Sequence, residues 1–112
     1  MTSKNKIAIV TGATGGIGFE VAKRLGQDGF TVALNGIEDD EGAKRVAELE
    51  AEGITAEYYG FDVTNEEEVT RNINAIGQKY GKIDVLVNNA GGLGGRSRFE
   101  EMTTDFTERS WL

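Results

Sequence analysis

Cysteine, histidine and proline are all absent from this chain of 112 residues. Without cysteine there can be no disulfide and no thiolate metal site, and the lack of histidine removes the other usual zinc ligand. It also excludes a Ser-His or Cys-His catalytic pair, so a general base would have to be another residue type. The absence of proline is unusual, but it points to no particular function.

Long apolar runs and excess positive charge are missing as well. No apolar stretch approaches the roughly 20 residues that cross a bilayer, and the first one is interrupted at Gly12, before it reaches signal-peptide length. We therefore expect no membrane insertion, no secretion and a cytoplasmic location. The formal net charge of −7 at pH 7 would repel a phosphate backbone, so nucleic acid is not an expected partner.

Short β-type runs alternate with stretches of helical periodicity, and a glycine follows each of the first three helices, where a left-handed residue is expected. The predicted strands cover residues 6–10, 31–35, 56–61 and 83–88; the predicted helices cover residues 16–28 and 40–52, a third that ends at Gly81 and a fourth near residues 103–112. This pattern is typical of βαβ units. It predicts one α/β domain over residues 1–112, a doubly wound Rossmann-type parallel sheet in the strand order 3-2-1-4 with about four helices.

The apolar positions of each helix predict the face that it buries. The expected packing residues are Ile17, Val21, Ala22 and Leu25 in the first helix, Ala43, Val46, Ala47 and Leu49 in the second, and Val69, Ile73, Ile76 and Tyr80 in the third. Residues 64–67 form a capping-box sequence, in which the Thr64 hydroxyl and the Glu67 carboxylate would satisfy amides at the start of the third helix.

The fourth strand has the uninterrupted apolar composition of a strand that is covered on both faces, although the predicted order places it at an edge. This conflict indicates that the sheet continues after this strand. The domain is therefore expected to be incomplete at its C-terminal end.

The stretch from Thr11 to Gly18 follows the first strand and opens the first helix. Its spacing is Gly-x-x-x-Gly-x-Gly, which allows a tight exit from the strand at Gly12 and a close backbone approach at Gly16 and Gly18. The helix N-terminus would offer amides to a pyrophosphate, and no Lys-Ser or Lys-Thr follows the glycines as in a P-loop. A tight turn without a ligand is the alternative interpretation.

Together, three segments resemble the N-terminal signatures of the short-chain dehydrogenases/reductases. They are this glycine turn, Asp62-Val63 after the third strand, and Asn88 to Gly91 after the fourth. The resemblance covers about residues 4–106. It implies a parent protein that transfers hydride between NAD or NADP and a small carbonyl or alcohol substrate, and that forms homo-oligomers.

The resemblance also assigns cofactor-binding residues. It implies that the pyrophosphate and its ribose are lined by Gly12, Thr14, Gly15 and Ile17, the adenine by Asp62 and Val63, and the second ribose by Asn89, Ala90 and Gly91. Two of these segments have structural alternatives: Asp62 could instead cap the loop before the third helix, and Asn88 is expected to tie neighbouring strands rather than touch a ligand.

The choice between NAD and NADP stays open. By the resemblance, an NAD-selecting acid would fall near Gly36 and a phosphate-binding arginine near Ile37, and neither is present. The acidic residues 38–40 could disfavour a 2′-phosphate, or they could simply be the solvated start of a helix.

The family's catalytic Tyr-x-x-x-Lys pair has no match in this chain, and its auxiliary asparagine would fall after Leu112. We therefore predict no catalytic residue, no metal ligand and no turnover by these 112 residues alone. Two alternatives remain. One is a catalytically silent dinucleotide-binding or redox-sensing module, and the other is a non-functional truncation product that associates through the fourth strand.

Overall fold

The structure, a computed structural model, describes residues 6–89. Seven elements alternate along this part of the chain: β1 (Ile7–Val10), α1 (Gly16–Gln27), β2 (Thr31–Gly36), α2 (Asp39–Ala51), β3 (Ala56–Gly60), α3 (Glu66–Tyr80) and β4 (Val85–Val87). The strands pair in parallel in the order β3-β2-β1-β4. The predicted α/β class and strand order are confirmed, whereas the fourth predicted helix lies outside the described residues.

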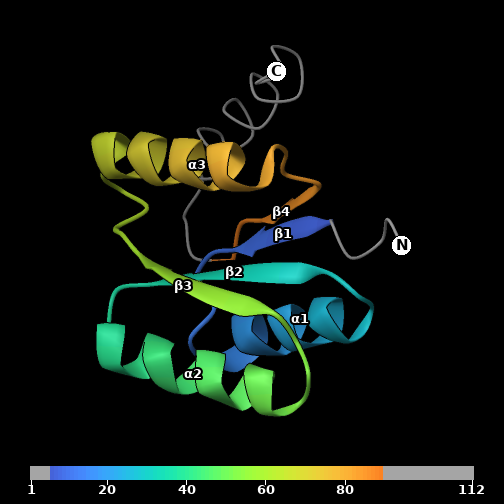
Figure 1. The fold of residues 1–112 in the computed structure, drawn as a ribbon. Helices are drawn as coiled ribbons and strands as arrows, with labels where there is room; N and C mark the ends of the chain where they lie inside the picture. Colours follow the sequence, from blue (N-terminus) through green and yellow to red (C-terminus); the bar gives the residue numbers. More distant parts are fainter. Residues whose placement is uncertain (1–5, 90–112) are drawn as a thin grey trace.

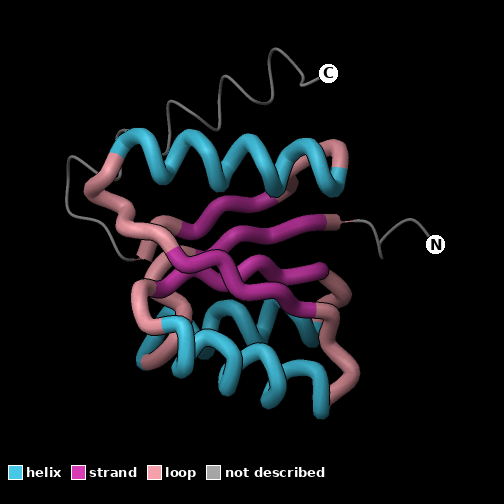
Figure 2. Tube along the Cα trace, turned by 60° about the vertical axis from the view of Figure 1, so that its left-hand side comes forward, coloured by secondary structure: helices cyan, strands magenta, loops and turns pink. Residues whose placement is uncertain are grey.

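The sheet forms the middle of three layers. Helix α3 covers one face, and α1 and α2 lie side by side on the other (Figures 1 and 2). Alternate side chains of β1 therefore enter different cores: Ile7 and Ile9 join the cluster beneath α3, and Ala8 and Val10 join the cluster above α1 and α2. Because β1 has a strand on each side and helices on both faces, all four of its residues are buried.

The predicted buried faces of two helices are only partly right. In α1, Ala22 is buried and Val21 and Leu25 pack against the core as predicted, but Ile17 is 75% exposed because the buried face continues through Gly18 and Phe19. In α2, the predicted packing residues Ala43 and Ala47 are exposed, and Gly42 is buried with Leu49. The reason lies in β3, where the Tyr58 ring occupies the space that a Cβ on Gly42 would need, at 2.3 Å.

Helix α3 begins one residue later than the capping-box prediction. The Asn65 side chain accepts a hydrogen bond from the Glu68 amide at 3.0 Å, and the Glu68 carboxylate accepts from the Asp62 amide at 3.0 Å. The N-cap is therefore Asn65 and not Thr64, whose hydroxyl donates to Asp62 Oδ1 at 2.7 Å. The predicted end at Gly81 is confirmed, and its φ of 84° is the left-handed conformation that favours glycine.

Strand β4 is an edge strand of the described sheet, as the order predicted, and it is shorter than expected. Its three residues are half-buried rather than covered on both faces, because within residues 6–89 only β1 pairs with it. None of the helices in this range is long and apolar enough to cross a bilayer.

Candidate functional site

The segments singled out by the sequence follow β1, β3 and β4 at the same edge of the sheet. Val10 pairs in register with Leu34 on one side and with Val87 on the other, and Gly36 pairs with Gly60. In a parallel sheet the carboxyl ends of all strands meet at one edge, which is where ligands bind in doubly wound folds. The glycine turn, Asp62 and Asn89 therefore lie along one rim. Ala90 and Gly91 lie outside the described residues.

The glycine turn is shaped by two glycines in the left-handed conformation, Gly12 at φ 59° and Gly16 at φ 57°. Gly18 allows the first turn of α1 to pack on the turn, because a Cβ there would lie only 2.1 Å from the Gly12 carbonyl oxygen. By contrast, a Cβ on Gly15 or Gly16 would meet nothing within 4 Å. The start of α1 thus faces open space.

This helix start carries no competing anion within the described residues. Gly15 is the N-cap and provides no side-chain hydrogen bond, and the first turn of α1 holds no acidic residue. The first amides of a helix have no intrahelical partner, and together with the helix dipole they attract negative charge. The geometry therefore fits a phosphate group at this position. The exposed Ile17 offers an apolar surface beside it.

Asn35, near the end of β2, holds the glycine turn in place through hydrogen bonds. This side chain is only 2% exposed, and its Oδ1 accepts from the Gly12 amide at 3.2 Å, while its own carbonyl accepts from the Ala13 amide at 2.8 Å. Its Nδ2 donates to the Phe61 carbonyl at 2.9 Å, one residue before Asp62. Asn35 therefore joins two of the three segments. This role of Asn35 was not predicted, although a single polar residue at the end of an apolar strand is a usable signal for it.

Asn89 joins the third segment to the same turn. Its Nδ2 donates to the Gly12 carbonyl at 3.1 Å, and its backbone amide donates to Thr11 Oγ1 at 2.9 Å. The Thr11 hydroxyl in turn donates to Asn88 Oδ1 at 3.2 Å. Asn88 thus links β4 to β1, the structural role that was expected of it. Both backbone polar groups of Gly12 are bound by asparagine side chains from other strand ends.

Asp62 is exposed and closes a turn before α3. Its Oδ1 accepts from the Thr64 amide at 2.9 Å and from the Thr64 hydroxyl at 2.7 Å, and these bonds lower the pKa of Asp62. No residue within 6–89 binds Oδ2, so the carboxylate keeps an acceptor that faces solvent. Asp62 therefore caps the loop before α3, as the structural alternative expected, but it does so through Oδ1 only. Val63 is half-buried and packs against the α3-side core.

The end of β2 carries neither an arginine nor an acidic residue at the two positions, Gly36 and Ile37, where the resemblance to short-chain dehydrogenases/reductases would place the residues that select between NAD and NADP. Gly36 stands close to Thr14, since a Cβ on it would meet the Thr14 methyl at 2.6 Å, and Ile37 is 77% exposed. The acidic residues that follow belong to the start of α2: Glu38 is its N-cap, and its first turn holds Asp39, Asp40 and Glu41. Carboxylates at a helix N-terminus are stabilised by the dipole, which explains them without a ligand.

Neither a metal centre nor a catalytic pair is found in the described part. No group of three or more Asp or Glu residues within residues 6–89 is placed to hold a metal ion. Tyr80 packs against the α3-side core, and its hydroxyl donates to Glu57 at 2.6 Å, away from the rim. The described part of the site can therefore bind a ligand through backbone amides and a few side chains, among them the Asp62 carboxylate.

Comparison with known proteins agrees with this arrangement. A family model described as short chain dehydrogenase matches residues 6–111. The uncharacterized oxidoreductase YxjF of Bacillus subtilis is 38% identical over 106 residues, which are 95% of this chain and 41% of that protein. The 2-dehydro-3-deoxy-D-gluconate 5-dehydrogenase of Formosa agariphila is 42% identical over 106 residues, 94% of this chain and 40% of that protein.

Solved structures give the same picture. The crystal structure of an actinorhodin polyketide ketoreductase variant with NADPH superimposes with a TM-score of 0.87 at 30% identity, covering 96% of this chain and 51% of that chain. A metagenomic short-chain oxidoreductase in complex with NADP has a TM-score of 0.75 at 33% identity, covering 79% and 40%. This chain thus spans about two fifths of the length of the curated relatives that it matches.

Proposed function

Because the chain belongs to the short-chain dehydrogenase family, we propose that it forms the cofactor-binding part of an NAD(P)-dependent oxidoreductase. The observation that carries the proposal is the double anchoring of Gly12. Its amide is bound by Asn35 and its carbonyl by Asn89, so the ends of β1, β2 and β4 form one preorganised rim. A rigid rim lowers the entropic cost of binding an extended dinucleotide.

The proposed cofactor contacts follow the order of the segments along this rim. Gly12, Thr14, Gly15 and Ile17 would line the pyrophosphate and its ribose, next to the open space over Gly15 and Gly16. Asp62 would accept from the adenine amino group through Oδ2, with Val63 beside the ring. Asn89, Ala90 and Gly91 would pass beneath the second ribose. The choice between NAD and NADP remains open in this proposal.

In the parent protein, the bound nicotinamide would exchange hydride with a small carbonyl or alcohol substrate. The residues of this chain would bind and orient the cofactor, and they would not move the substrate's proton, since no tyrosine in the sequence has a lysine four residues later. We therefore propose that the 112 residues alone bind cofactor without turnover. We also propose that the parent protein associates with further copies of itself and not with nucleic acid, which the net charge of −7 would repel.

The direct test is a titration of the 112-residue chain with NADH, followed by the increase in nicotinamide fluorescence and checked by calorimetry. We expect saturable binding that ADP-ribose displaces, because it retains the adenosine and the pyrophosphate. Nicotinamide mononucleotide should not compete at equal concentration, since it lacks the adenosine. If NADH does not bind up to about 1 mM to a chain that melts cooperatively, the proposed function is wrong.

A further inference from the structure

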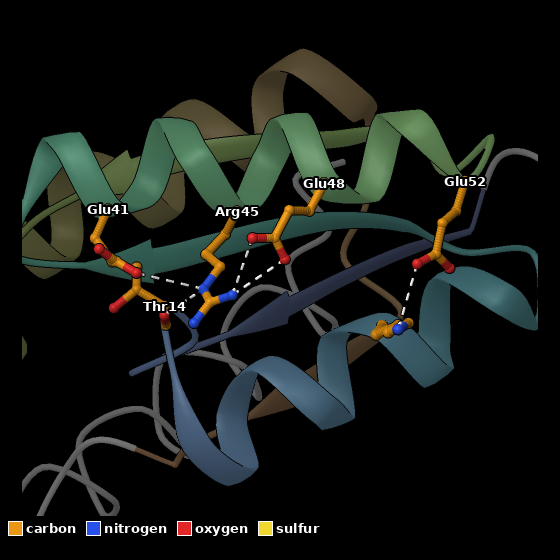
Figure 3. A network of polar contacts seen from close by, with 6 residues as sticks. Thr14, Glu41, Arg45, Glu48 and Glu52 are labelled. Carbon is orange, nitrogen blue, oxygen red and sulfur yellow. Dashed lines mark hydrogen bonds and ion pairs between the residues drawn. The ribbon is translucent and has the colours of Figure 1, made fainter.

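Arg45 reaches from the middle of α2 to the glycine turn that precedes α1. Its Nε donates to the carbonyl oxygen of Thr14 at 2.8 Å, across a sequence separation of 31 residues (Figure 3). The side chain is 27% exposed. An arginine on the surface of one helix thus binds the backbone of a loop that belongs to another βα unit.

Three groups hold the guanidinium in this position. Glu41 and Glu48, one turn before and one turn after it on α2, lie at 3.5 Å and 3.1 Å from its nitrogens. The ring of Phe19, from the first turns of α1, lies 4.5 Å from the guanidinium carbon. Two carboxylates and an aromatic face fix both the direction and the plane of a fork-shaped donor.

The carbonyl that Arg45 binds belongs to the peptide that leads into Gly15. In a planar trans peptide the C=O of one residue and the N–H of the next point in opposite directions. Anchoring the Thr14 oxygen on the α2 side therefore aims the Gly15 amide to the opposite side. No residue within 6–89 accepts a hydrogen bond from that amide. Gly15 itself cannot define this orientation through a side chain, and a Cβ on it would meet only open space.

We propose that Arg45 is a positioning residue for the glycine turn: by holding the Thr14 carbonyl, it orients the Gly15 peptide toward the phosphate groups of the dinucleotide. This inference rests on the proposed function. Arg45 acts through the backbone and not as a counterion, because its charge is already matched by Glu41 and Glu48. It should therefore strengthen NAD and NADP binding by the same factor.

The test compares Arg45→Met with Arg24→Met in the 112-residue chain. Arg24 is a matched control, since it loses the same charge, lies 75% exposed on α1 and forms an ion pair with Asp28. We expect Arg45→Met to raise the Kd for NADH and for NADPH by about tenfold each, the effect of losing one charge-assisted hydrogen bond. Arg24→Met should leave both Kd values within about twofold.

If Arg45→Met unfolds, Arg45→Lys serves as a second variant, because it keeps the charge and the aliphatic stem. Lysine lacks the fixed fork of donors, so this variant should also weaken the binding of both cofactors several-fold. The anchor has a readout that needs no cofactor: the Gly15 amide resonance should shift in both Arg45 variants and stay in place in Arg24→Met.

Three results would overturn the inference. The first is unchanged Kd values in folded Arg45 variants of a chain that binds NADH. The second is a loss confined to NADPH, which would make Arg45 a direct ligand of the 2′-phosphate. The third is an unmoved Gly15 resonance. If the unsubstituted chain fails to bind NADH, the proposed function fails instead, and the Gly15 shift still reports whether Arg45 orients this peptide.

Discussion

The Asn35 side chain accepts a hydrogen bond from the Gly12 amide at 3.2 Å and donates one to the Phe61 carbonyl at 2.9 Å. The substitution Asn35→Ala would leave both backbone groups without this partner in a buried site. Each unsatisfied group costs about 1–3 kcal/mol, so the free energy of unfolding should fall by about 2–6 kcal/mol. Chemical denaturation measures this value. Asn74→Ala, on the exposed side of α3, is the control and should change stability by less than about 0.5 kcal/mol; an equal loss in both would contradict the role of Asn35.

Gly18 and Gly15 should respond in opposite ways to the addition of one methyl group. In Gly18→Ala the Cβ would lie 2.1 Å from the Gly12 carbonyl, so α1 or the turn must move, and we expect a loss of about 3 kcal/mol or more. In Gly15→Ala the Cβ meets nothing within 4 Å, and the extended backbone at φ −167° suits any residue. Its thermal unfolding should match that of the unsubstituted chain, and a large loss in this variant would show that the turn is packed differently.

Most of the fold could be predicted because it depends on local signals. Apolar runs, helical periodicity and glycines after the helices indicated seven elements of the described part, and the right-handed crossover rule indicated their order. Helix faces were harder to predict, because the partner decides them. Ala47 is exposed and Gly42 is buried since Tyr58, 16 positions after Gly42 in the sequence, fills the space beneath α2.

The long-range contacts of the site could not be predicted. The glycine spacing indicated where the turn lies, but not that Asn35 and Asn89 bind its two backbone groups from separate strand ends. Arg45 is one of several charged residues in the sequence of α2, and its contact with Thr14 depends on how α1 and α2 pack together (Figure 3). Such pairs depend on tertiary packing, which periodicity does not encode.

The start of α3 offers a test of which residue caps it. Asn65→Ala should lower the free energy of unfolding by about 1 kcal/mol, because the Glu68 amide loses its side-chain acceptor. Thr64→Ala should cost less, since the exposed Thr64 hydroxyl only supports the Asp62 carboxylate and water can replace it. Denaturant titrations of both variants decide the matter. If Thr64→Ala loses more stability than Asn65→Ala, Thr64 is the N-cap and the capping-box prediction is right.

Asp62→Asn tests the proposed adenine contact while keeping the turn. The asparagine oxygen can still accept from the Thr64 amide and hydroxyl, but an NH₂ group replaces Oδ2 and cannot accept from the adenine amino group. We expect the Kd for NADH to rise about tenfold with unchanged thermal stability. The analogue with hypoxanthine in place of adenine carries an acceptor at this position and should bind the variant better than the unsubstituted chain. Equal Kd values for NADH in both proteins would remove Asp62 from the site.

A cluster beneath α3 predicts how stability depends on pH. Tyr59 and Tyr80 both donate to Glu57 Oε1, at 2.7 and 2.6 Å, and Lys79 pairs with the other oxygen. Burial, then the hydrogen bond to Glu57, raises the pKa of both tyrosines, and burial together with the nearby Asp39 raises the pKa of Tyr58 to about 12. All three tyrosines of the chain are therefore held neutral in the folded state.

An unfolded tyrosine has a pKa of about 10, so the unfolded chain releases these protons at lower pH than the folded one. The stabilisation is fully present below about pH 10 and is lost as the pH rises from there toward the folded pKa values. We expect phenolate absorbance and loss of circular dichroism to rise together in an alkaline titration. Tyr80→Phe should reduce the steepness of this loss, because one of the three groups no longer ionises. If the tyrosines titrate near pH 10 while the dichroism spectrum stays intact, the folded protein does not hold them neutral and the prediction is wrong.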